Sequence, residues 1–251
     1  MYEINEKLTS GKPILKKVNK DYFTRHAIKT HFVTEKDNYL DLISNYVKPQ
    51  YNKGDILIIC EKIIALCQKR VVYSDELKVS KLAKFLSRFV NVTPAGKGIG
   101  NPEKMEVVLQ KAGIIRVLIG ALAAALTRPF GIKGLFYKIV KSESQEIDGF
   151  NDNAFDYYKD KGILSPKNPE QVCNEIKNKL NINAVIADAN DLNVEILGKP
   201  TDSKYSDSFL KQIIEDNPAG QHNEQTPFIL VKKEKVKKNL TKNATYQKVG
   251  K

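Results

Sequence analysis

Short uninterrupted runs of apolar residues, bounded by glycine, proline or charged residues, are the clearest pattern along the chain. Ile56–Cys60 is such a run, and its length is typical of a strand that is buried on both faces. Similar runs predict further strands over 135–140, 184–187, 194–197 and 228–231. Because only a short polar stretch separates 184–187 from 194–197, we expect these two strands to pair as a hairpin.

Apolar residues at intervals of three and four predict several amphipathic helices. The clearest boundaries are Asn101-Pro102, which suit an N-cap and a first helical position, and Gly113, which suits a helix end. Thr34 and Asp37 imitate a capping box at the start of another helix. The helices are expected over 36–47, 75–90, 102–112, 114–126, 172–180 and 209–214. Strands and helices together predict an α+β fold, a mixed β-sheet with flanking helices.

The segment 114–126 is the most apolar part of the chain. Only ten uncharged residues separate Arg116 from Thr127, whereas a helix that spans a bilayer needs about 20 apolar residues. We therefore expect a buried or interface helix and no membrane partner. Its small residues at 120, 121 and 123–125 would let another helix approach closely, which also fits the interface of a homodimer.

Composition indicates a globular chain with a charged end. With 251 residues and 41% apolar residues, the chain has ample material for a core. The net charge is +12, of which eight lysines and one glutamate over 232–251 supply +7, so the other residues carry +5. We interpret 1–231 as a single domain, with two intertwined lobes as the alternative, and 232–251 as a solvated basic tail. Tyr246 is the tail's only ring, so a nucleic-acid-binding arm is not favoured.

Neither the cysteines nor the first residues indicate an exported protein. Cys60, Cys67 and Cys173 are odd in number and form no CxxC or Cys/His metal spacing, so they are expected to be reduced core thiols. The first residues lack the apolar stretch of a signal peptide, and a cytoplasmic protein is expected.

Polar clusters at the ends of predicted elements are the candidate chemistry. The run Asn183 to Asp191 passes from a predicted strand directly into carboxylate and amide oxygens, with Asp188 at the strand end. Clusters around Asp148 and over 220–227 are also rich in oxygen atoms. Hard divalent cations prefer such oxygen ligands, so the three clusters together suggest one site. The alternative is that the Asp188 side chain only stabilises a turn by hydrogen bonding to the neighbouring backbone.

The charged pair Glu61-Lys62 directly follows the run Ile56–Cys60. It could either cap the helix that follows or face a ligand. The sequence contains no Walker or GxGxxG motif and no Ser/His/Asp or Cys/His arrangement, so no catalytic residue is assigned.

The order of these motifs resembles the coenzyme F-420 gamma-glutamyl ligases, especially their divergent bacterial relatives. The resemblance covers roughly 25–231. It rests on Lys53-Gly-Asp-Ile-Leu-Ile-Ile-Cys-Glu-Lys62 with Gln68-Lys-Arg70, on Ile147-Asp148-Gly149, on Ala184-Val-Ile-Ala-Asp188-Ala-Asn190, and on Gly220-Gln-His-Asn-Glu-Gln-Thr-Pro227.

The resemblance implies a GTP-dependent enzyme that uses divalent metal, Mn or Mg, and forms a homodimer. It implies that such an enzyme joins glutamate to a small-molecule acceptor, a deazaflavin precursor. By position, Asp148 and Asp188 would be the metal ligands. The resemblance places the nucleotide against Lys62, Asn151, Gly220, Gln221, Glu224 and Thr226.

The sequence also departs from the pattern of the resembled ligases. Where they usually carry hydroxyl residues and a Ser-Lys pair, this chain has Glu61-Lys62 and Ala65-Leu66. Their Asp-Thr-Asn-Gly-Arg becomes Asp188-Ala-Asn-Asp-Leu192, which removes a hydroxyl and a cation. Two hypotheses follow: a ligase-like enzyme of altered acceptor specificity, or a nucleotide- or ligand-binding module without ligation. A nucleic-acid-binding protein is supported by the tail alone.

Overall fold

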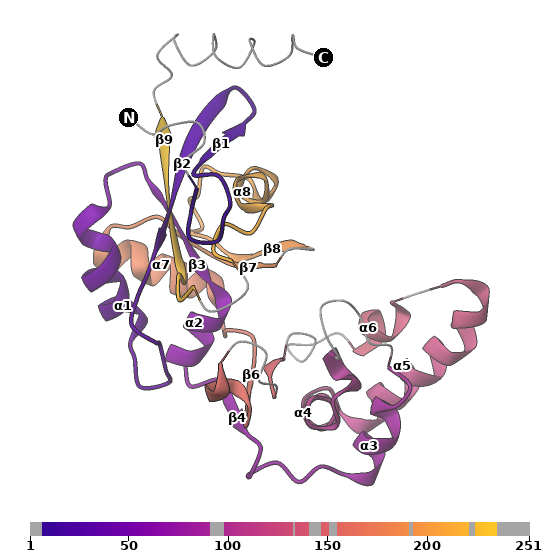
Figure 1. The fold of residues 1–251 in the computed structure, drawn as a ribbon. Coiled ribbons are helices and arrows are strands. Elements are labelled where there is room, and N and C mark those ends of the chain that lie inside the picture. The colour runs from indigo at the N-terminus through magenta and orange to yellow at the C-terminus, as the bar shows by residue number, and fades with distance from the viewer. Residues whose placement is uncertain are drawn as a thin grey trace. The chain divides into compact units, whose positions relative to one another are not determined.

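The computed structural model describes residues 7–90, 98–132, 134–140, 147–150, 155–190, 193–220 and 224–234. The chain forms two compact units (Figure 1). The first unit comprises Met1–Ile64 and Asn168–Lys251, and the second comprises Ala65–Lys167. Of the predicted tail, 232–234 continue a strand, and 235–251 lie outside the described residues.

A six-stranded mixed sheet forms the centre of the first unit, which confirms the predicted α+β fold. Its strand order is β1-β2-β9-β3-β7-β8. Only the β3–β7 pair is parallel. The strands are β1 (Leu15–Val18), β2 (Asp21–Ile28), β3 (Ile56–Cys60), β7 (Ala184–Ala189), β8 (Val194–Gly198) and β9 (Phe228–Glu234).

Helices cover both faces of this sheet, and for that reason β3 has the continuous apolar run seen in the sequence. Residues 56–59 are at most 4% exposed. Helix α8 (Asp207–Ile214) lies on one side, with α7 (Pro169–Leu180) and α1 (Tyr39–Leu42) on the other (Figure 1). Leu210 and Ile213 of α8 pack against Ile58 and Val185 in one apolar cluster.

The helix predicted over 36–47 is present from Tyr39 and runs through α1 into a π-helix, η1 (Ile43–Val47), and a 3-10 turn, η2 (Lys48–Gln50). Its N-cap is Asn38, whose side chain accepts from the Leu40 amide at 2.8 Å. Thr34 and Asp37 do not begin this helix. The Asp37 carboxylate accepts from the Thr34 amide at 2.7 Å, as in a capping box, but this bond closes the turn that precedes the helix.

The second unit contains helices and a small antiparallel sheet of order β4-β6-β5. Asn101 caps α4 as predicted, since its side chain accepts from the Glu103 amide at 2.7 Å, and Gly113 ends that helix. The elements are β4 (Val71–Tyr73), α3 (Lys81–Ser87), η3 (Gly98–Gly100), α4 (Pro102–Ala112), α5 (Ile114–Thr127), η4 (Arg128–Phe130), α6 (Leu135–Val140), β5 (Asp148–Gly149), η5 (Asp156–Tyr158) and β6 (Lys161–Ile163). Helix α2 (Glu61–Cys67) spans the boundary between the units.

Two local predictions were wrong in the second unit. Residues 135–140 form α6 and not a strand, and its Phe136 and Val140 pack on Gly120 of α5. A Cβ at Gly120 would lie 3.0 Å from Val140 Cγ2, so glycine permits this close approach within one chain. The helix predicted over 75–90 is shorter, because Ser80 caps it and accepts from the Ala83 amide.

Helix α5 was expected to be buried or to lie at an interface, and within the chain it is not buried. Val117 and Gly120 are its buried residues, whereas Ile115 is 77% exposed and Leu122 is 62% exposed. In the described part of the chain, no single helix is long and apolar enough to cross a bilayer. The segments 102–112 and 114–130 would be long enough together, but they meet at a bend of 116°.

A buried arginine joins strand β2 to the end of α8. Arg25 of β2 is 0% exposed, and its guanidinium donates to the Ile213 carbonyl at 2.9 Å and to both carboxylate oxygens of Asp216. It also donates to the Pro13 carbonyl. Burial alone would raise the pKa of Asp216, but hydrogen bonding and charge attraction from Arg25 lower it on balance. An uncompensated carboxylate here would be costly.

Replacing Arg25 by methionine is expected to lower the free energy of unfolding by roughly 3 to 5 kcal/mol, because Asp216 and two carbonyls lose their donor. Urea unfolding followed by circular dichroism measures this. The matched control is Lys233→Met, which breaks the exposed pair with Asp21 at 2.6 Å and should cost at most about 1 kcal/mol. Equal losses in the two variants would contradict the role given to Arg25.

Candidate functional site

The carboxyl ends of β3 and β7 lie side by side in the first unit. Their parallel register pairs Ile59 with Ile186 and Cys60 with Ala187. Asp188 follows in β7, and Glu61 and Lys62 follow β3 as the first residues of α2. In open α/β sheets, ligands bind outside the carboxyl ends of parallel strands.

The loop that leads into β9 arrives at this same end of the sheet. Phe228 opens β9 and pairs with Ile59 on one side and with Ile28 of β2 on the other. Gly220, Glu224 and Thr226 are therefore brought toward the end of the sheet that carries Lys62 and Asp188. We call this region the carboxyl end of the sheet: Glu61, Lys62, Asp188, and the described residues of 220–227.

Strand alternation decides which face Asp188 presents. Ala187 and Ala189 both pack against the apolar cluster beneath α8. Because successive side chains of a strand point to opposite faces, Asp188 points away from α8. It pairs with Glu195 of β8, and it is half-buried. Two carboxylates opposite each other repel, and a bound cation would relieve that repulsion.

The pKa of the Cys60 thiol depends on three charged side chains near it. Burial raises its pKa to about 11; the Lys62 ammonium lowers it, while the carboxylates of Glu61 and Asp188 raise it further. One cation and two carboxylates thus lie close enough to act on one sulfur atom. Burial also raises the pKa of the Cys173 thiol, to about 12. Both values support the prediction that these cysteines are inert core thiols.

The loop before β9 is held by its own hydrogen bonds. The Thr226 hydroxyl donates to the Ala219 carbonyl at 2.7 Å, and the Asn217 side chain donates to the Gly220 carbonyl at 3.3 Å. Gly220 has a φ of 85°, and a Cβ there would lie 2.5 Å from the Glu224 carboxyl carbon. The missing side chain at Gly220 thus leaves room for the Glu224 carboxylate. The hydrogen bond from Thr226 to Ala219 closes the loop.

The remaining candidate residues are not among the described residues of the first unit. Asp148 belongs to the second unit, in β5, where it is exposed and accepts from the Gly149 amide at 2.8 Å. Asn151 and Gln221 lie outside the described residues.

The end of β2 adds a neighbour that the sequence did not reveal. The Thr30 amide donates to the Gln225 carbonyl at 3.1 Å, which ties β2 to the loop before β9. The next residue, His31, bonds Asp37 at 2.9 Å and the Tyr46 hydroxyl at 2.8 Å. Strand β2 has no clean alternation because the buried Arg25 interrupts it, so this connection had no simple signal in the sequence.

Two departures from the ligase pattern have a packing explanation. Ala65 and Leu66 of α2 are 1% and 0% exposed, so they are core positions and do not face a ligand. Ala189 packs against the cluster beneath α8. Leu192 lies outside the described residues.

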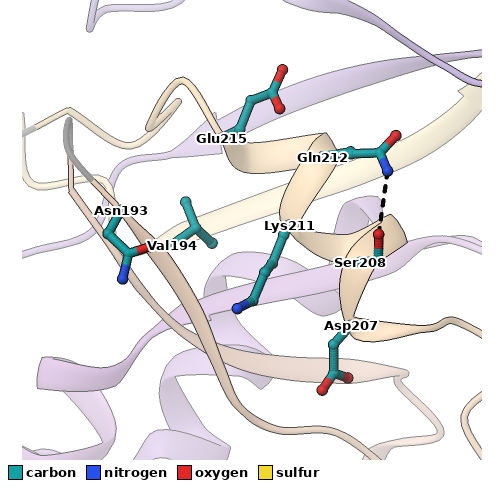
Figure 2. Close-up of a pocket in the computed structure, with 7 residues that line it drawn as sticks. All are labelled: Asn193, Val194, Asp207, Ser208, Lys211, Gln212 and Glu215. Carbon is teal, nitrogen blue, oxygen red and sulfur yellow. Dashed lines mark hydrogen bonds between the residues drawn. The ribbon is translucent and has the colours of Figure 1, made fainter.

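A shallow pocket of about 500 Å³ lies on the other face of the sheet, between the start of β8 and α8 (Figure 2). Figure 2 shows Lys211 reaching toward Asn193, and Gln212 donating to Ser208 at 3.4 Å. Asp207 is already paired with Lys199 at 2.6 Å. Asp188 points to the opposite face, so this pocket is not part of the carboxyl end of the sheet.

The few oxygen donors at this end of the sheet suit a magnesium ion that is held partly by its substrate and water. They do not suit an ion that is enclosed by protein ligands alone. No group of three or more His, Cys, Asp or Glu side chains in the described parts of the chain is placed to hold a metal. Magnesium commonly uses only one or two carboxylates and completes its shell with phosphate oxygens and water. The carboxylate of Asp188, at a strand end, is a donor of this type.

Residues 27–205 match the family model described as F420-0:Gamma-glutamyl ligase. The chain belongs to this family. The match includes Lys62, Asp148 and Asp188, and it ends before the loop over 220–227. No curated protein matches the chain. Membership of this ligase family confirms the resemblance drawn from the sequence motifs.

Adding a side chain at Gly220 should displace Glu224 and strain the backbone. We expect Gly220→Ala to lower the free energy of unfolding by more than Gly54→Ala, which also has a positive φ but open space around it. In a Glu224→Ala background, the loss at Gly220 should fall to that of Gly54→Ala, about 1 kcal/mol. Urea unfolding of the four variants measures this. An undiminished loss in that background would contradict the contact.

Raised pKa values keep Cys60 and Cys173 as thiols. At about pH 8 the thiolate fraction of a group with a pKa near 11 is roughly one in a thousand, so labelling by iodoacetamide should be very slow. Peptide mapping after a short exposure should find both cysteines unlabelled in the folded protein and labelled in urea. Rapid labelling of folded Cys60 would contradict its inert role.

Proposed function

We propose that the protein is a metal- and GTP-dependent ligase-like enzyme that forms an amide bond on an acceptor still to be identified. The observation that carries the proposal is the meeting of Lys62, Asp188 and the loop before β9 at the carboxyl end of the sheet. A cation, a carboxylate and a hydrogen-bonded loop are what a nucleotide with a bound metal ion requires. Family membership supports the same reaction class.

In this proposal Asp188 is a protein ligand of a divalent ion, Mg or Mn. The ion would neutralise phosphate charge during transfer. Asp188 has a fixed strand backbone behind it, so its oxygens need little ordering to bind. Lys62 supplies a second positive charge toward the phosphates. Lys62 lies in the first turn of α2, directly after the carboxyl end of β3.

The loop before β9 would hold the rest of the nucleotide. Glu224 offers only acceptor oxygens at neutral pH, which suit the N1–H and N2–H donors of guanine better than they suit phosphate. Gly220 leaves room for that carboxylate, and Thr226 fixes the loop from the inside. Asn151 and Gln221 complete the proposed nucleotide contacts.

The chemistry needs positioning rather than a protein nucleophile. A substrate carboxylate oxygen attacks the γ-phosphorus, GDP leaves, and an acyl phosphate forms. The amine nitrogen then attacks the acyl carbon, phosphate leaves, and the nitrogen loses a proton. Each step is favoured by charge neutralisation and alignment, which Lys62 and Asp188 would provide.

A binding module without ligation is the second candidate. It is favoured by the small number of acidic side chains that the described structure gathers for a metal. The chain also lacks a hydroxyl at Ala189 and a cation at Leu192. A module of this kind would bind nucleotide without consuming it.

Thermal unfolding with GTP and Mn²⁺ tests the site. At a ligand concentration of about 100 times Kd, binding to the folded state adds roughly 2.7 kcal/mol, so the midpoint should rise. Asp188→Asn should abolish the metal-dependent rise and should not lower the apo midpoint, because an amide of the same shape replaces a carboxylate that faces Glu195. Asp202→Asn, an exposed acid paired with Lys177, is the matched control and should keep the rise.

An equal rise in Asp188→Asn would remove Asp188 from the site. Release of phosphate from GTP that depends on both an amine and a carboxylate substrate would separate the ligase from the binding module. A stabilised protein that releases no phosphate with any pair of acid and amine tested would favour the module.

A further inference from the structure

The second unit presents an apolar face on α5 and the turn that follows it. Every large apolar side chain with high exposure in the described residues lies in this unit. On α5 they are Ile114, Ile115, Leu118, Ile119, Leu122 and Leu126, which are 43–77% exposed. At about 100° per residue these positions fall within one arc of roughly 140°, while Val117 and Gly120 turn inward. We call this the α5 face.

The turn after α5 extends the apolar surface. Phe130 is 81% exposed and Ile132 is 53% exposed. The segment 114–140 contains no acidic residue, and its charged residues are Arg116, Arg128, Lys133 and Lys138, a net charge of +4. A contiguous apolar face whose only charges are positive is unusual for a surface in water.

An open groove runs beside this face, and its lining has the same character. It has a volume of about 820 Å³ and is lined by six apolar or backbone-only residues and one cation: Ala112, Gly113, Ile114, Ile115, Ile119, Ile139 and Arg116. Apolar walls fit hydrocarbon, and the guanidinium of Arg116 at their edge fits a phosphate ester.

We propose that the α5 face binds the surface of an anionic lipid bilayer. A helix of 14 residues is about 21 Å long, too short for a hydrocarbon core of about 30 Å, and the 116° bend prevents α4 from extending it. Such a helix lies in the plane of the interface, with its apolar side inserted and its flanking cations near the headgroups. The expectation of no membrane partner considered only a spanning helix, and interfacial binding needs no span.

Charge distinguishes this occupant from a second copy of the chain. Two α5 faces packed together would bring the cations of both copies, Arg116, Arg128 and Lys138, into one interface. No acidic residue of 114–140 would compensate their charge. Anionic headgroups compensate all of these cations. Arginine and lysine side chains flanking an inserted face can also extend toward the headgroups while their stems remain in the apolar layer.

Flotation of the full chain with vesicles tests the proposal. The protein should float with vesicles of phosphatidylcholine and phosphatidylglycerol and much less with phosphatidylcholine alone. Changing Ile115 and Leu122 together to glutamate should weaken binding roughly ten-fold or more, since both are exposed and their apolar area is lost. The matched control, Ser208→Glu with Gln212→Glu, makes the same charge change on exposed positions of α8 and should retain binding. All variants keep the basic tail, so the difference reports α5 alone.

A second measurement uses the absence of tryptophan from the sequence. Phe130→Trp places a single indole at the exposed turn, where it should not affect folding. Its emission should shift to the blue on adding anionic vesicles and be quenched by lipids brominated on their acyl chains.

Three results would overturn the proposal: no flotation of the wild-type chain, full flotation of the Ile115/Leu122 variant, or an indole that stays in water. Light scattering that finds two chains for the wild type and one for the Ile115/Leu122 variant would assign the face to a second copy instead. The thermal response to GTP and Mn²⁺ concerns the other unit's residues Lys62 and Asp188, so its failure would leave the vesicle result standing.

Discussion

The pairing of β3 with β7 on one side and β9 on the other is the constraint on which the candidate site depends. A central strand buried on both faces must satisfy every backbone N–H and C=O through its neighbours. The parallel partner fixes Asp188 one residue beyond the level of Cys60, and the antiparallel partner brings the 220–227 loop to the same level. A slip of one residue in β7 would turn Asp188 toward α8 and bury its charge among apolar side chains.

Packing on both sides keeps that register unique. The cluster beneath α8 accepts Val185, Ala187 and Ala189, whereas the opposite face buries Ala184 and Ile186 completely. Arg25 then ties strand β2 to the end of α8 through Ile213 and Asp216. The scaffold of the site is thus rigid in the first unit, and its ligand-facing groups are few, which is consistent with a reaction that relies on charge and alignment.

The sequence predicted those parts of the fold whose signals are local. Asn101, Pro102 and Gly113 bound α4 because capping depends on neighbouring atoms only, and the β3 run needed nothing beyond its own apolarity. The strand predicted over 135–140 was wrong because a short apolar stretch shows neither a helical nor a strand period. The packing against Gly120 that accompanies the helix comes from a residue distant in the sequence. Strand β2 was not predicted because Arg25 is buried, so a charged residue occupies a position where the strand pattern requires an apolar one.

The site itself was predictable as residue types at element ends, but not as a geometry. Asp188 and the loop before β9 were both recognisable from oxygen-rich clusters. That they meet beside Lys62 depends on the strand order, which local patterns do not encode. Ala65 and Leu66, at which the chain departs from the ligase pattern, are buried core positions, and the sequence comparison did not indicate this.

Anomalous diffraction from crystals grown with Mn²⁺ and GTP tests the central claim most directly. The account predicts a manganese peak about 2.0 to 2.6 Å from a carboxylate oxygen of Asp188, with phosphate oxygens on the same ion and the base beside the loop before β9. A nucleotide bound elsewhere, with no manganese at Asp188, would contradict the assignment of the carboxyl end of the sheet as the active centre.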